Sequence, residues 1–231
     1  MKRSQINAIL RSAQDYFDQH QFRLPAWAHW TPQDWAAHGK DCREVVECQL
    51  GWDITDFGSG DFARRGLTLF TLRNGKLGSW AKTYAEKIMV VEDGQETPTH
   101  FHFQKAEDII NRGGGTLVLQ LWNSDGAGEK APTPVEASVD GIGRRIEAGG
   151  YVRLAPGESI CLTRGLYHRF YGEGRVLVGE VSQVNDDHSD NRFYETLGRF
   201  PRIDEDEAPW RLLVSDYADR LPEVTSRPHA C

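Results

Sequence analysis

Long apolar runs and clusters of basic residues are both missing from this sequence. No stretch of 18 consecutive apolar residues occurs, and the start Met-Lys-Arg-Ser-Gln-Ile-Asn is not followed by an apolar segment. These absences argue against a membrane-spanning helix and an export signal. The 27 basic residues are outnumbered by 34 acidic ones, and no basic cluster exceeds a pair. Nucleic acid and membranes are therefore unexpected partners, and we expect a soluble, cytoplasmic protein.

Cysteine is also scarce, with 4 residues in a chain of 231. Their positions form no CxxC pair: they are Cys42, Cys48, Cys161 and Cys231. So few cysteines in a chain of this length do not make a disulfide framework or a thiolate zinc site. We expect them to be reduced thiols.

Short β-like segments separated by glycines dominate the sequence after Gly51. They are residues 67–72, 83–91, 116–122, 151–154, 158–162, 167–170 and 176–182. Regular short strands of this kind are typical of a β-sandwich or barrel, with turns expected at Asn74-Gly75 and at the glycine run 113–115. A chain of this size commonly folds as one such domain.

The first 50 residues have a different pattern. Apolar residues recur every three or four positions from Gln5 to Gln19, which predicts an amphipathic helix with Ser4 as its N-cap. Thr31 and Pro32 predict the start of a second, shorter helix. We therefore predict a single all-β domain over 1–231, with a helical extension at 1–50 packed outside a barrel at 51–200. Residues 201–231 are predicted to be an acidic loop and tail.

Three histidines and a glutamate suggest a metal site. His100 and His102 leave the same face of a strand, and Glu107 follows after enough chain for a bend. His168 comes after a second, glycine-bracketed strand-like segment. Neutral imidazoles with a carboxylate suit manganese, iron, cobalt, nickel or zinc. The residues alone leave the choice among these metals open.

The spacing of these residues resembles the two motifs of the cupin family. The first cupin motif is Gly, five residues, His, one, His, four, Glu, six, Gly, and it is matched throughout by Gly94, His100, His102, Glu107 and Gly114. In the second motif Gly157, Gly165 and His168 fit, whereas Thr163 replaces the usual proline and Tyr171-Gly172 the usual asparagine. The resemblance implies a cupin barrel, which is a double-stranded β-helix or jelly roll.

A longer pattern resembles the bacterial D-lyxose isomerase family of cupins. It includes Gln95, Pro98, the segment from Lys105 to Gly115, the segment from Glu180 to Phe193, and the segment from Arg199 to Glu207. The resemblance runs from the N-terminal helix to about Tyr217. It implies a cytoplasmic homodimer that converts D-lyxose to D-xylulose, and often D-mannose to D-fructose, with a divalent ion that is typically Mn²⁺. It also implies that the ligands are His100, His102, Glu107 and His168.

Isomerisation of this kind moves a proton between neighbouring carbons, so acid and base groups are needed beside the metal. On a strand, Lys105 would share a face with Glu107, and a nearby cation would keep part of it unprotonated. Its acidic partner is expected among three residues of the late acidic loops, Asp187, Glu205 and Glu207. Lys87 and Gln95 are candidate substrate contacts. The sequence is about equally compatible with a surface position for Lys105 and for Lys87.

Two other functions are open at this point. A cupin dioxygenase would use iron at the same ligands and would consume oxygen. A non-catalytic sugar-binding module would bind sugar without converting it. The aromatic connector from Leu24 to Trp30 is an additional reason to expect a homodimer, because a monomer would have difficulty covering it.

Overall fold

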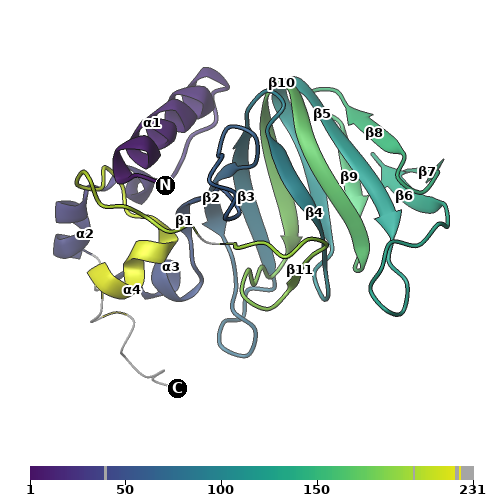
Figure 1. The fold of residues 1–231 in the computed structure, drawn as a ribbon. Coiled ribbons are helices and arrows are strands. Elements are labelled where there is room, and N and C mark those ends of the chain that lie inside the picture. Colours follow the sequence, from purple (N-terminus) through teal and green to yellow (C-terminus); the bar gives the residue numbers. More distant parts are fainter. Residues whose placement is uncertain (39–40, 200, 222–223, 225–231) are drawn as a thin grey trace.

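The computed structural model describes residues 1–38, 41–199, 201–221 and 224. Its helices gather on one side and its strands form a barrel on the other (Figure 1). The helical elements are α1 (Arg3–Gln19), η1 (Ala26–His29), α2 (Pro32–His38), α3 (Arg43–Glu47), η3 (Val214–Asp216) and α4 (Tyr217–Arg220). No helix within the described residues is long and apolar enough to cross a membrane.

The strands follow one another through the middle of the chain. They are β1 (Gly51–Thr55), β2 (Leu67–Arg73), β3 (Tyr84–Val91), β4 (Glu96–His102), β5 (Glu107–Asn123), β6 (Val135–Val139), β7 (Ile142–Ile146), β8 (Tyr151–Leu154), β9 (Ser159–Leu162), β10 (Leu166–Gln183) and β11 (Asn191–Phe193). The predicted strands are all present. Their bounds differ most at β5, which begins at Glu107 and not at Thr116, and at β10, where two predicted segments join into one strand.

Two long antiparallel strands, β5 and β10, belong to both walls of the barrel. The first half of β10 pairs with β4, and its second half pairs with β3. Strand β5 pairs with β10 along almost its whole length and also with β8 and β9. This arrangement makes two facing sheets that share their central strands, so the predicted cupin jelly roll is confirmed (Figure 1).

The glycine run 113–115 is part of β5, so the prediction of a turn there was wrong. The register between β5 and β10 shifts at this point, and Gly114 has a φ of +87°. A β-carbon on Gly114 would lie 2.1 Å from the Tyr16 hydroxyl and 2.3 Å from the Arg175 carbonyl oxygen. The glycines therefore let β5 bend from one sheet into the other beneath α1.

Strands β1, β2 and β3 are largely buried on both faces, because one face lines the barrel and the other lies under the helices. In β3, Met89 and Val91 belong to the barrel core, whereas Ile88 and Val90 pack with the helical layer. This alternation places Lys87, two residues before Met89, on the barrel side. A lysine whose ammonium group lies inside the barrel is stable there only if negatively charged or hydrogen-bonding groups are close to it.

Helix α1 covers the outer face of β1, β2 and β3 with Ile6, Leu10, Ala13 and Phe17. This confirms the predicted helix, although Lys2 occupies the N-cap position and the side chain of Ser4 binds Asp206 instead. The division of the chain at residues 50 and 200 remains a prediction, and residues 222–223 and 225–231 of the predicted tail lie outside the described part.

The connector from Leu24 to Trp30 is half-buried, because its tryptophan rings pack against other parts of the same chain. The ring of Trp27 lies 5.0 Å from Phe70, and the ring of Trp30 lies 5.0 Å from Trp35, both between centroids. The sequence argument that a second subunit must cover this connector is therefore not supported.

Candidate metal centre and active site

The three histidines come from two neighbouring strands of one sheet. His100 and His102 lie on β4, and His168 lies on β10 directly opposite His100. The register of this pair slips between His168 and Phe170, where β4 carries one extra residue at Pro98 and Thr99. Such a β-bulge re-aims side chains, and proline is tolerated there because a bulge lacks a regular ladder hydrogen bond.

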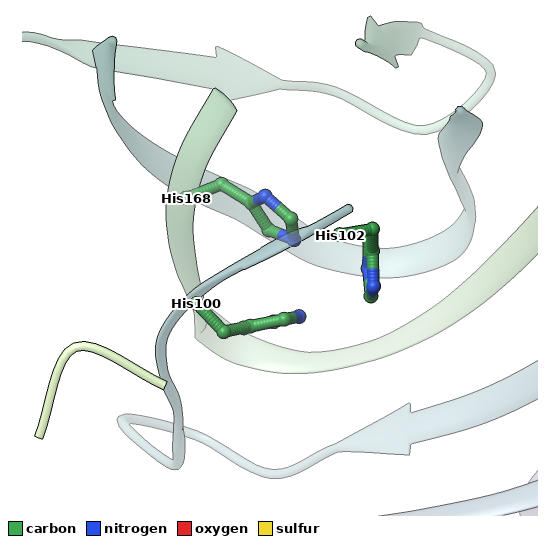
Figure 2. A group of neighbouring side chains, drawn as sticks. All are labelled: His100, His102 and His168. Carbon is green, nitrogen blue, oxygen red and sulfur yellow. The ribbon is translucent and has the colours of Figure 1, made fainter. Parts of the chain in front are cut away.

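The imidazole rings of His100, His102 and His168 converge on one space (Figure 2). One ring nitrogen from each histidine lies within 4.8 Å of the others. Glu107 approaches the same space from the facing sheet, and its Oε1 lies 3.3 Å from Nε2 of both His102 and His168. All four side chains are buried. The four residues predicted as ligands are therefore brought together.

Backbone carbonyl groups fix two of these rings. Nδ1 of His100 lies 2.8 Å from the carbonyl oxygen of Pro98, and Nδ1 of His168 lies 3.0 Å from that of Leu166. A carbonyl oxygen only accepts, so each Nδ1 carries the proton and each Nε2 keeps its lone pair for a ligand. Burial lowers the pKa of His100 well below its ordinary value, and the neighbouring histidines lower it further. Both effects favour the neutral imidazole that binds metals.

Three buried histidine nitrogens of this centre have no hydrogen-bond partner among the described residues. They are Nδ1 and Nε2 of His102 and Nε2 of His168. Both Nε2 atoms lie 3.3 Å from Oε1 of Glu107 but without hydrogen-bond geometry. Leaving such groups unsatisfied in a protein interior is costly, so they point to a missing ligand. Three imidazole nitrogens and one carboxylate oxygen fit a divalent transition-metal ion.

Lys105 lies beside this centre, but on the connector between β4 and β5 and not on a strand. The Asp190 carboxylate holds this connector by accepting hydrogen bonds from the backbone N–H groups of Gln104 and Lys105. Nζ of Lys105 lies 2.8 Å from Glu107 Oε2 and 2.8 Å from Glu180 Oε1. The location agrees with the sequence prediction, although the strand on which that prediction relied is absent.

The expected partly unprotonated state of Lys105 depended on a bound cation, and in the metal-free protein the surrounding carboxylates have the opposite effect on its pKa. Burial alone would lower the pKa of Lys105, but the carboxylates of Glu107 and Glu180 outweigh it and raise the pKa above its ordinary value. Lys105 is therefore an ammonium group between two carboxylates, suited to donating a proton and not to accepting one.

Glu180 is the functional candidate that sequence reasoning missed. It lies on β10 opposite Lys87, is 5% exposed, and has its Oε2 3.3 Å from Lys87 Nζ. Burial would raise its pKa, but the charges of Lys105 and Lys87 lower it overall. The strand alternation carries a signal for it, since Val176 and Val178 face the barrel core and Glu180 continues that face.

Asn185 connects the two buried lysines. Its Oδ1 accepts hydrogen bonds from Lys87 at 2.7 Å and from Lys105 at 3.0 Å. Its backbone N–H donates to Oδ1 of Asn74 at 2.9 Å. Lys87 is thus a buried residue of the site, so the surface position that its sequence also allowed does not apply.

Asp187 also reaches the cavity. Its Oδ2 lies 3.0 Å from Nη2 of Arg199, which contacts Oδ2 of Asp53 at 2.6 Å. Burial would raise the pKa of Asp187, but the charges of Arg199, Lys87 and Lys105 lower it well below its ordinary value. This late loop is therefore not fully solvated, because the Asp187 side chain is only 15% exposed and pairs with Arg199 at the cavity.

These side chains line one cavity with a polar and an apolar wall. The empty space between the lining atoms, which includes solvent at the open mouth, is about 470 Å³. The polar lining comprises His100, His102, Lys87, Lys105, Glu107, Glu180, Asp187, Asn191, Arg199 and Thr97. The apolar lining comprises Phe57, Leu67, Leu69, Met89, Ile109, Phe170 and Phe193.

Three predicted site residues lie elsewhere. Both oxygens of Glu205 bind the guanidinium of Arg3, and Glu207 accepts a hydrogen bond from Asn7, so both carboxylates are held against α1. The Gln95 amide is fully buried between the backbone groups of Phe62 and Glu92. None of the three lines the cavity. Their predicted roles in the site are corrected, because each side chain is already bound by another part of the fold.

The family model for D-lyxose isomerase matches residues 1–217. The D-lyxose/D-mannose isomerase of Serratia proteamaculans is 52% identical over 223 residues, which cover 94% of this chain and 98% of that protein. The enzyme of the same name from Escherichia coli O157:H7 is 50% identical with the same coverage. An L-ribose isomerase mutant from Acinetobacter sp. DL28, solved in complex with L-ribose, has a TM-score of 0.60 at 14% identity and covers 88% of this chain and 98% of its own. That likeness shows the shared fold. The two relatives and the match over almost the whole sequence show that this chain belongs to the D-lyxose isomerase family.

Proposed function

We propose that this protein is a metal-dependent aldose–ketose isomerase that converts D-lyxose to D-xylulose and D-mannose to D-fructose. Relatives with about half of their residues identical are named for these aldoses. The observation that carries the proposal is the pairing of two features in one cavity. Unpartnered histidine nitrogens beside Glu107 suit a metal ion, and the buried pair Lys105 and Glu180 suits proton transfer.

The metal ion, when bound to His100, His102, Glu107 and His168, supplies a Lewis acid for the oxygen atoms on C1 and C2 of the sugar. Mn²⁺ is our proposal for this ion because it is typical of the D-lyxose isomerase family, and a set of imidazoles and a carboxylate is compatible with it.

The protein side chains move the protons. We assign the carbon-bound proton to Glu180, whose ionised carboxylate takes it from C2 of the aldose and returns it to C1. Between these steps the sugar is an enediol. The Lys105 ammonium donates a proton to O1 as the enediol forms and takes back the proton of O2 as the ketose forms. Every proton is thus returned, and the two side chains end as they began.

Lys87 and Asn185 support this pair. Lys87 lies close enough to Glu180 to favour its ionised form, and Asn185 holds both ammonium groups through a single oxygen. Asp187, at the same cavity, is a candidate for binding sugar hydroxyl groups together with Arg199. We no longer propose Glu205, Glu207 or Gln95 for any of these roles.

Two alternatives remain separable by experiment. A dioxygenase of this fold would stop without oxygen, whereas the isomerase needs none. A sugar-binding module would have no use for a second buried carboxylate held between two lysines, and Glu180 therefore favours the enzyme. Assays under nitrogen on aldopentoses and aldohexoses, each with and without chelator, distinguish the three functions.

We also propose a homodimer and a cytoplasmic location. Both rest on the family, since the chain itself already packs against the tryptophans of the aromatic connector. Light scattering at micromolar concentration tests the dimer, and a strict monomer would remove that proposal while leaving the chemistry unchanged.

The variant Glu180→Gln tests the assignment of the proton carrier. It preserves shape but cannot accept a proton, so we expect turnover to fall by about a hundredfold to ten-thousandfold with the metal content unchanged. Glu205→Gln is the matched control and should retain full activity. Normal turnover by Glu180→Gln would exclude Glu180 as the base.

A further inference from the structure

Thr97 is a second polar side chain that the β4 bulge turns into the barrel. In β4, Thr97 is three residues before His100, and their partners in β10 are Phe170 and His168, which are only two residues apart. The extra residue in β4 lets Thr97 and His100 face the same interior, although an unbroken strand would place them on opposite faces. Thr97 accordingly lines the cavity.

The Thr97 hydroxyl has no hydrogen-bond partner among the residues that the structure describes. The residue is only 3% exposed, and its Oγ1 is buried. By contrast, Oγ1 of the buried Thr55 accepts a hydrogen bond from the backbone N–H of Phe57 at 2.9 Å. An unsatisfied buried hydroxyl is costly. Valine has nearly the same shape, also favours strands and would avoid this cost.

The nearest cross-strand neighbour of Thr97 is apolar. Phe170 is its direct partner in β10, lines the same cavity and is 3% exposed. The charged lining residues Lys87, Glu107 and Glu180 lie on β3, β5 and β10 instead. A polar ligand atom that reached Thr97 would meet its hydroxyl beside an apolar ring.

We propose that Thr97 is a specificity-determining residue whose hydroxyl binds the terminal hydroxyl of the sugar substrate. The step from His168 to Phe170 on β10 corresponds to about 7 Å along the strands. Thr97 is therefore separated from the histidines by a distance comparable to the length of an open sugar chain. With C1 and C2 at the histidine centre, the far end of the chain comes within reach of Thr97. This inference rests on the proposed isomerase function.

The test combines a change in the protein with a change in the sugar. The manganese-loaded enzyme and its Thr97→Val variant are assayed with D-mannose and with 6-deoxy-D-mannose, which lacks only the terminal hydroxyl. We expect Thr97→Val to lower kcat/KM for D-mannose by about ten- to a hundredfold and to leave that for the deoxy sugar nearly unchanged. Thr97→Ser should retain the preference for D-mannose. Thr99→Val is the matched control. Thr99 belongs to the same bulge, two residues after Thr97, but it does not line the cavity.

A binding measurement keeps this test independent of turnover. Calorimetry with D-mannose and 6-deoxy-D-mannose in a Glu180→Gln background, which should not isomerise them, should show the same loss of discrimination when Thr97→Val is added. Equal losses for both ligands, or no loss for either, would overturn the role of Thr97. Failure of the proposed function is distinguishable, because the wild-type protein would then convert no aldose while the binding comparison could still be made.

Discussion

Replacing Lys105 by methionine removes one charge from the centre of the site while keeping the length of the side chain. In the wild-type protein, Nζ of Lys105 lies 2.8 Å from each of two buried carboxylates, those of Glu107 and Glu180. Asn185 adds a hydrogen bond of 3.0 Å. The variant Lys105→Met leaves both carboxylates without this partner.

The expected loss in the free energy of unfolding is large because Lys105 is only 2% exposed. Removing one partner from a buried ion pair typically costs about 3–5 kcal/mol. For the metal-free variant we expect a loss of about 3 kcal/mol, at the lower end of this range, because Lys87 still neutralises Glu180. For a domain of this size that corresponds to a fall in Tm of roughly 6–12 °C. Bound metal should reduce the loss because the cation takes over the charge of Glu107.

Catalysis should suffer independently of stability. Loss of the proton donor to O1 should lower kcat by about a hundredfold to ten-thousandfold at temperatures where the variant is folded. Calorimetric unfolding, elemental analysis and ketose formation are measured on the same samples, with the exposed Lys76→Met as control. A metal-free variant as stable as the wild type, together with undiminished turnover, would refute both the pairing and its catalytic role.

We expect three further outcomes for variants at Glu205, His168 and Glu180. Glu205→Gln should lower Tm by about 2–4 °C through its contact with buried Arg3, yet leave isomerisation unchanged; a loss of activity in the folded variant would reinstate Glu205 in the site. His168→Ala should abolish stoichiometric metal binding and the rise in Tm that added Mn²⁺ gives the wild type, and full metal occupancy by elemental analysis would contradict its role as a ligand. The metal-free wild type should lose stability as the pH falls below about 4, because the folded-state pKa of Glu180 lies below its unfolded value, so its contribution is complete above the unfolded pKa and disappears as the carboxylate becomes protonated. Thermal unfolding of Glu180→Gln should show a shallower pH dependence, and an identical one would contradict this explanation.

The sequence predicted most of the barrel because its strands have strong local signals. Alternating apolar residues and glycine turns identified most of the β-segments, and the resemblance to the cupin motifs brought His168 together with His100, His102 and Glu107. What local patterns could not show is the bulge that places Thr97 beside His100, because a bulge depends on how β4 pairs with the distant β10. The bend at Gly114 was likewise mistaken for a turn, since a glycine run looks the same in both settings.

The acidic partner was the least predictable part of the site. Acidic loop residues such as Glu205 looked suitable because they are polar and late in the chain, but a buried arginine on α1 already binds that carboxylate. Glu180 looked like part of an ordinary strand. Its role depends on Lys87 and Lys105, which come from distant segments, and such pairing is not encoded in local periodicity.

The most direct test of the account is isomerisation in deuterated water by the manganese-loaded wild-type enzyme. D-lyxose is incubated under nitrogen with and without chelator, and the ketose is analysed by mass spectrometry and NMR. The account predicts oxygen-independent formation of D-xylulose that stops on chelation, with solvent deuterium entering at C1 through the carboxylate of Glu180. Formation of ketose without any solvent label, under conditions where exchange outpaces the return of the proton, would contradict proton transfer, and the absence of ketose from every aldose tested would contradict the isomerase itself.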